Sequence, residues 1–136
     1  MYQIKNFTDN DDVKIIAQLG AFQVVEYQRD LSVPPNSAIT AYYSSQMNVR
    51  KRQVICNLSR AQVTIQAGAM QWMLGNVNAT TGIKGVGDFL GKAVRGKATG
   101  ESAIKPEYTG DGLLVLEPTY SHLIRMDATQ WGGSVV

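Results

Sequence analysis

Residues 62–81 decide the fold, and they read Gln-Val-Thr-Ile-Gln-Ala-Gly-Ala-Met-Gln-Trp-Met-Leu-Gly-Asn-Val-Asn-Ala-Thr-Thr. The first part of the stretch alternates between an apolar face and a polar face, with Val63, Ile65 and Ala67 opposite Gln62, Thr64 and Gln66. A period of two residues is typical of a strand that is buried on one side. The stretch therefore predicts β-structure and a scaffold, and it gives no indication of a substrate.

Two glycines, Gly68 and Gly75, interrupt this pattern. Between them, one face is shared by Met70, Trp72 and Leu74, and after Gly75 the next face is shared by Val77, Ala79 and Thr81. We therefore expect the strand to turn twice, once at each glycine.

Length and composition fit one globular domain spanning residues 1–136. The chain is 44% hydrophobic and 18% charged, with a formal net charge of +2. A charged share below the usual quarter hints at additional buried or subunit-facing surface. The small net charge does not demand a nucleic-acid or membrane partner. No apolar run approaches the ~20 residues that span a bilayer, and the acidic start has no targeting pattern, so a cytoplasmic location is expected.

Residues that carry chemistry are scarce. The single cysteine, Cys56, lies in an apolar run and predicts a small buried side chain. With one His and one Cys, a zinc site is not expected. His122 is the only residue that suggests proton transfer, and a structural role is the favoured interpretation. We expect no catalytic residue, no metal, no cofactor and no small-molecule ligand.

The N-terminal half predicts two strands and a helix. Residues 13–29 form two β-rich runs hinged near Gly20, and both faces of the second run are apolar, as expected of a strand that is covered on two sides or lies at an interface. After Pro34 and Pro35, either Asn36 or Ser37 can cap a helix. The helix would have one apolar face, made of Ile39, Tyr42, Tyr43 and Met47. A strand is the competing interpretation of this segment.

The C-terminal half predicts further strands around a second short helix. Strands are expected at residues 53–58, 102–108, 113–116 and 122–127, and a tight turn at residues 110–112, Gly-Asp-Gly. Within the glycine-rich residues 82–100, the side chains of Val86, Phe89, Leu90, Ala93 and Val94 fall on one side of a helix. The glycines there match neither familiar phosphate-binding pattern.

Two basic groups are candidate phosphate contacts. The first consists of Arg50, Lys51 and Arg52. The second consists of Lys92 and Arg95, with their neighbours Lys84 and Lys97. If they met on one face they could bind nucleic acid or an anionic surface. Solvated strand and helix faces are the favoured interpretation of these groups. Oligomer contacts are expected instead from apolar residues of the strands and the chain end, namely Phe22, Val24, Tyr27, Trp72, Val135 and Val136.

Five ordered motifs resemble the altered-inheritance-of-mitochondria family in its bacterial form. They are Gln-Ala-Gly-Ala-Met at 66–70, Gly-Ile-Lys-Gly-Val-Gly at 82–87, Gly-Glu-Ser at 100–102, Gly-Leu-Leu-Val-Leu-Glu-Pro-Thr-Tyr at 112–120 and Trp-Gly-Gly-Ser-Val-Val at 131–136. The resemblance covers about two-thirds of the chain well.

The resemblance implies an antiparallel β-sandwich like that of the tryptophan RNA-binding attenuation protein, with an inserted helix and a tendency to form homo-oligomers. Members of the family normally continue beyond the Trp-Gly-Gly segment, so the domain is expected to be truncated at its C-terminal end, with an open sheet edge. The family has no established catalytic residues, and shared architecture does not transfer a function.

The sequence therefore favours a non-enzymatic, self-assembling interaction or scaffold protein. The alternative is a protein that binds nucleic acid or an anionic surface through its basic groups.

Overall fold

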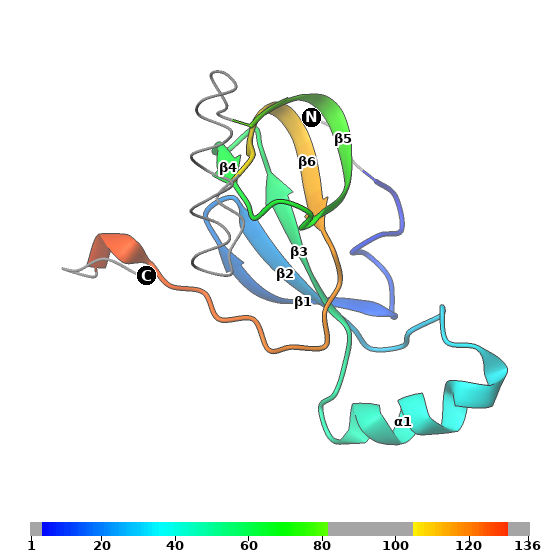
Figure 1. The fold of residues 1–136 in the computed structure, drawn as a ribbon. Coiled ribbons are helices and arrows are strands. Elements are labelled where there is room, and N and C mark those ends of the chain that lie inside the picture. Colours follow the sequence, from blue (N-terminus) through cyan, green and yellow to red (C-terminus); the bar gives the residue numbers. More distant parts are fainter. Residues whose placement is uncertain (1–3, 82–104, 131–136) are drawn as a thin grey trace, which may run out of the picture.

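One curled antiparallel sheet forms the body of the protein in a computed structural model that describes residues 4–81 and 105–130 (Figure 1). Its strands are β1 (Val13–Leu19), β2 (Phe22–Tyr27), β3 (Arg52–Asn57), β4 (Val63–Thr64), β5 (Met70–Thr80) and β6 (Glu107–Leu116). The described helices are α1 (Ala38–Gln46) and the single 3-10 turns η1 (Pro35–Ser37) and η2 (Ala128–Gln130). The mostly β class with antiparallel strands is confirmed, and closure into a sandwich stays a prediction.

Strand β6 organises the sheet because both of its edges are paired. One edge pairs with β5 along the whole length of β6, and the other pairs with β3 at the C-terminal half and with β4 at the N-terminal end. Beyond β3 the sheet continues to β2 and ends at β1. The buried strand expected at residues 113–116 is thus the C-terminal half of β6, with Leu114 and Val115 fully buried.

The tight turn predicted at residues 110–112 is wrong, because these residues lie inside β6. Gly112 pairs with Gly75 of β5, and Gly110 pairs with Val77. A Cβ atom on Gly112 would lie 2.2 Å from the carbonyl oxygen of Leu74. These glycines therefore permit the close approach of β5 to β6, and they do not reverse the chain.

The predicted interruption at Gly75 is also wrong, since β5 runs through it without a break. The turn at Gly68 is present, with a φ of 85°. A register shift between Met70 and Trp72 places these two side chains in different clusters, so they do not share a face as expected. Local alternation could not reveal this bulge, because it arises from pairing with β6.

Each face of the sheet carries an apolar cluster. The first includes Cys56, Leu58, Val63, Ile65, Tyr108 and Leu114. The second consists of Val13, Val25, Ile55 and Val115, and its neighbours include Phe7 and Trp72, whose ring centroids are 5.7 Å apart. The expectation that Cys56 is a small buried residue is confirmed, and the expected hinge is present as a turn at Gly20 and Ala21.

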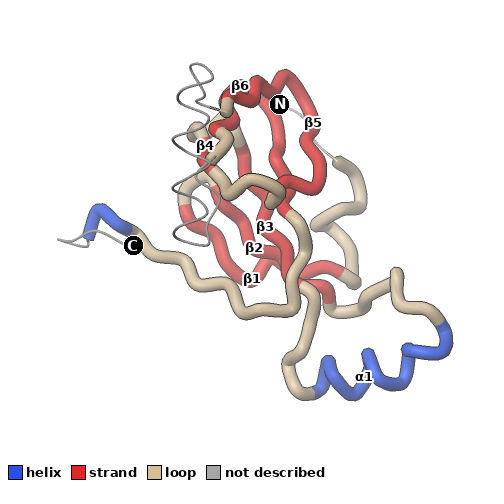
Figure 2. Tube along the Cα trace, viewed as in Figure 1, coloured by secondary structure: helices blue, strands red, loops and turns tan. Residues whose placement is uncertain are grey.

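The first predicted helix is confirmed as α1. Ser37 occupies its N-cap position, but its side chain makes no capping hydrogen bond. The helix does not bury its apolar face, since none of its nine residues is buried. It lies away from the sheet, at the end of a long excursion between β2 and β3 (Figure 2). Helical periodicity therefore predicted the element correctly, although not its packing.

The strand expected at residues 122–127 is wrong. Residues 121–130 are exposed and lack strand structure, although Arg125 Nη1 donates a hydrogen bond of 2.6 Å to the carbonyl oxygen of Gln18. The second predicted helix and residues 102–104 of the strand expected at 102–108 lie outside the described residues, while Glu107 and Tyr108 of that strand lie in β6.

Candidate functional site

The site with the most polar chemistry lies where β2 ends and β3 begins, at the two ends of the segment that contains α1. Antiparallel pairing sets Glu26 opposite Arg52. The Oε2 atom of Glu26 lies 2.7 Å from Nη2 of Arg52, and its Oε1 atom lies 3.2 Å from Nη1 of Arg50. Glu26 and Arg52 are both buried. This ion pair is therefore shielded from water.

Several groups hold the Glu26 carboxylate in its charged form. Burial by itself raises the pKa of Glu26, but hydrogen bonds from Gln28, Arg50 and Arg52, together with the charge of Arg52, outweigh it. The pKa of Glu26 is therefore lowered below its ordinary value. The charged carboxylate thereby joins the end of β2 to Arg50 and Arg52.

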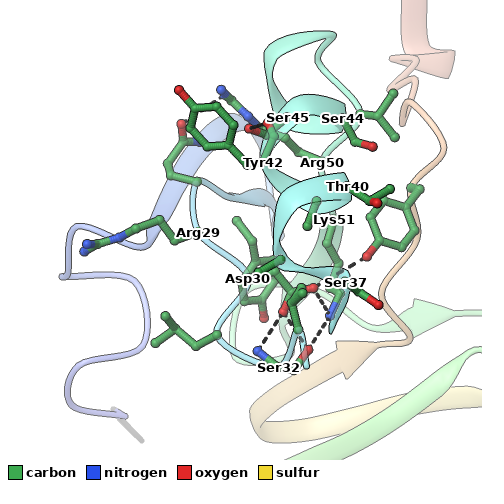
Figure 3. A pocket seen from close by; sticks show the side chains of 18 of the residues that line it. Arg29, Asp30, Ser32, Ser37, Thr40, Tyr42, Ser44, Ser45, Arg50 and Lys51 are labelled. Carbon is green, nitrogen blue, oxygen red and sulfur yellow. Dashed lines mark hydrogen bonds and ion pairs between the residues drawn. The ribbon is translucent and has the colours of Figure 1, made fainter. Parts of the chain in front are cut away.

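A second ion pair lies beside the first, between Lys51 and Asp30. The Nζ atom of Lys51 lies 2.7 Å from Oδ2 of Asp30 and donates a 3.0 Å hydrogen bond to Oγ of Ser32 (Figure 3). It also lies 5.9 Å from the ring centroid of Tyr27. Burial raises the pKa of Asp30, but the hydrogen bonds from Lys51 and Ser32 and the charge of Lys51 outweigh it, so the pKa is lowered.

On the opposite face of the sheet, Gln53 links four strands. Its Oε1 atom accepts a 2.7 Å hydrogen bond from the Tyr27 hydroxyl, and its Nε2 donates to Oε1 of Gln71 and to the carbonyl oxygen of Leu116, each at 2.7 Å. Gln53 is buried. These bonds hold side chains of β2, β3 and β5 to one another and to the backbone of β6 beneath the site.

An open groove of about 920 Å³ lies between these ion pairs and α1. One wall is formed by residues 27–34 and the other by η1 and α1, with Val49, Arg50, Lys51 and Tyr120 completing the lining. Its lining is rich in hydroxyl groups, including those of Ser37, Thr40, Ser44 and Ser45 (Figure 3). The Nε atom of Arg50 is buried without a hydrogen-bond partner among the described residues. The groove can contact a partner through both polar and apolar atoms.

The structure brings together only part of the predicted basic surface. Arg50 and Lys51 line the groove, whereas Arg52 is 2% exposed and faces Glu26. Lys92 and Arg95 lie outside the described residues. The prediction that these groups contact phosphate stays a prediction, and the ion pairs leave less free positive charge than the sequence indicates.

The predicted oligomer contacts are spread over the sheet. Phe22 is 40% exposed, while Val24, Tyr27 and Trp72 are half-buried. Tyr27 lines the groove and Trp72 packs against Phe7. Val135 and Val136 lie outside the described residues. His122 is exposed and is not among the residues that line the groove.

Sequence reasoning missed the two acidic partners, Glu26 and Asp30. A signal was present for Glu26, because a carboxylate inside a mostly apolar strand must find a cation when it is buried. Among the described residues, no helix is long and apolar enough to cross a bilayer.

Together, these features define a small antiparallel β protein in which residues 31–49, here called the arm, carry α1 away from the sheet. The base of the arm is held by the ion pairs Glu26–Arg52 and Lys51–Asp30. The family model described as Mitochondrial biogenesis AIM24 matches residues 43–135, and the chain belongs to this family. The match begins within α1, covers β3 to β6 and leaves out β1 and β2. No curated protein and no solved structure matches the chain.

Proposed function

We propose that this chain is a non-enzymatic interaction or scaffold protein that assembles with copies of itself in the cytoplasm. The observation that carries the proposal is the exposure of large apolar side chains over β1, β2 and the α1 arm. They include Ile15, Ile16, Leu19, Phe22, Leu31, Ile39, Tyr42, Tyr43 and Met47. Large exposed apolar surfaces mark interaction sites in soluble proteins.

The polar groups of the site support a structural role. Glu26 and Asp30 have lowered pKa values and are held in ion pairs. Carboxylates fixed in this way stabilise the base of the arm, and they do not exchange protons near neutral pH. The family match adds membership but no biochemical role.

Size-exclusion chromatography with multi-angle light scattering, at low and high salt, tests the proposal. We expect a defined oligomer whose mass does not change with salt, because apolar contacts are insensitive to screening. A monomer across micromolar concentrations would contradict the proposal.

The alternative function, binding of nucleic acid or an anionic surface, has weaker support. Arg50 and Lys51 line the groove, but each is already paired with a carboxylate, Arg50 with Glu26 and Lys51 with Asp30. If RNA binds at low salt and is released as salt rises, the basic groups are the functional surface instead.

A further inference from the structure

Helix α1 has little support from its own chain. None of its nine residues is buried, and Ile39, Tyr43 and Met47 are 74%, 65% and 79% exposed. Isolated helices shorter than ~12–15 residues are marginal in water, and most helices in proteins are stabilised by packing. A nine-residue helix in this position therefore needs a surface to pack against.

The arm that carries α1 has no charge. Residues 31–49 contain no Asp, Glu, Lys, Arg or His, although charged residues stand at both ends of the segment, at Asp30 and Arg50. Leu31 at the start of the arm is 79% exposed. A solvated arm would normally carry charged side chains, so the composition indicates an apolar partner surface.

The same chain exposes such a surface at the tip of the β1–β2 hairpin. Leu19 and Phe22 are paired across the hairpin and therefore share a face, and they are 38% and 40% exposed. Ile16 nearby is 44% exposed. The tip thus offers side chains of the same chemistry as the arm.

The arm does not lie against the hairpin tip of its own chain. The arm leaves β2 after Tyr27, whereas Phe22 begins the strand, and at ~3.3 Å per residue these ends lie roughly 17 Å apart. In Figure 1, α1 extends away from the sheet. Within one molecule the two apolar surfaces are therefore both left exposed, and a second copy can cover them.

The dipole of α1 also suits the positive charge at the hairpin tip. Helix α1 has no basic residue in its last turn. The hairpin tip is flanked by guanidinium groups, because Arg60 Nη1 donates to the Gly20 carbonyl at 3.3 Å and Arg125 Nη1 donates to that of Gln18. Positive charge favours the C-terminal end of a helix.

We propose that the arm of one molecule, residues 31–49, docks on the β1–β2 hairpin tip of a second copy. Ile39, Tyr43 and Met47 pack against Leu19 and Phe22 of that second copy. The C-terminal end of α1 lies nearest to the arginines of the tip. This inference rests on the proposed self-assembly and assigns the surfaces that carry it.

Disulfide crosslinking between two variants of the full chain tests the contact. Met47→Cys protein is mixed with Leu19→Cys protein and oxidised, and the native Cys56 does not interfere because it is fully buried. We expect a mixed dimer to form, and to form at least about 10-fold less with Asn76→Cys, an exposed position on β5. Equal yields from Leu19→Cys and Asn76→Cys would overturn the proposal.

A charge substitution on the arm gives a second measurement. The Ile39→Glu/Met47→Glu variant should lose the oligomer, as measured by light scattering. The matched Asn36→Glu/Gln46→Glu variant carries the same added charge at exposed polar positions of the arm that do not line the groove, and it should retain more of the oligomer. Circular dichroism confirms that both variants remain folded.

The outcomes separate the two proposals. If the wild type is an oligomer but both arm variants stay assembled and no mixed dimer forms, another surface drives assembly; this inference fails while the proposed function stands. If the wild type is a monomer, both fail. If the monomer binds vesicles of phosphatidylcholine and phosphatidylserine and the Ile39→Glu/Met47→Glu variant does not, the arm docks on lipid and the proposal is overturned.

Discussion

The Glu26 carboxylate lies directly across the β2–β3 ladder from Arg52, with Oε2 2.7 Å from Nη2. Arg52 also donates to Asn48, through Nη2 to the side-chain oxygen at 3.1 Å, while its backbone N–H and C=O pair with Thr119. One residue thus connects β2, the end of the arm and the segment after β6.

Arg52→Ala should destabilise the protein strongly, by about 3 kcal/mol, because it leaves the buried Glu26 charge without its closest partner. Urea unfolding followed by circular dichroism measures the change. Arg29→Ala is the matched control, since its ion pair with Asp12 is exposed and should contribute at most ~0.5 kcal/mol. Similar losses in the two variants would contradict a shielded pair at Glu26.

Stability should fall on acidification below about pH 4.5, the ordinary pKa of a glutamate. The folded pKa of Glu26 is lowered, so below the unfolded pKa the unfolded chain binds more protons than the folded one. The stabilisation is therefore present at neutral pH and lost as pH falls through the folded pKa. Urea unfolding at pH 7, 5, 4 and 3 should show a shallower decline for Glu26→Gln than for the wild type. Parallel curves would show that Glu26 does not contribute.

The thiol of Cys56 should be unreactive in the folded protein. It is fully buried, and burial raises its pKa to about 12. At pH 8, Ellman's reagent should react on the order of 100-fold more slowly with Cys56 than with a cysteine introduced at the exposed position Lys105. The difference should vanish in concentrated urea. Rapid labelling of the native wild type would contradict the buried position of β3.

Gly112→Ala should be among the most disruptive single changes in the sheet. The new Cβ would lie 2.2 Å from the Leu74 carbonyl oxygen and 2.9 Å from Cγ2 of Val77, so β5 must move away from β6. We expect a loss of about 3 kcal/mol or more, measured by thermal and urea unfolding.

Gly20→Ala is the control for this substitution. Gly20 has a φ of 55° and no atom within 4 Å of a Cβ, so only the ~1–2 kcal/mol cost of a left-handed alanine is expected. If Gly20→Ala were the more damaging change, the close approach of β5 and β6 would not be the reason for glycine at position 112.

Helix α1 shows what a local sequence pattern can predict and what it cannot. The spacing of Ile39, Tyr43 and Met47 predicted a helix because periodicity depends only on neighbouring residues. The same spacing suggested a buried face, which the structure does not have within one chain. What covers a face depends on distant segments or on another molecule, and periodicity carries no information on either.

The sequence by itself determined the mostly β class, the hairpin at Gly20, the helix after Pro35, the buried Cys56 and the family resemblance, because each depends on local composition or on ordered motifs. Only the tertiary structure decided that Gly110 and Gly112 lie inside a strand and that the basic residues Lys51 and Arg52 are paired with acids. Both outcomes come from contacts between strands that are distant in the chain. The physical reason is that a residue's conformation and charge state are set by what lies across the sheet from it.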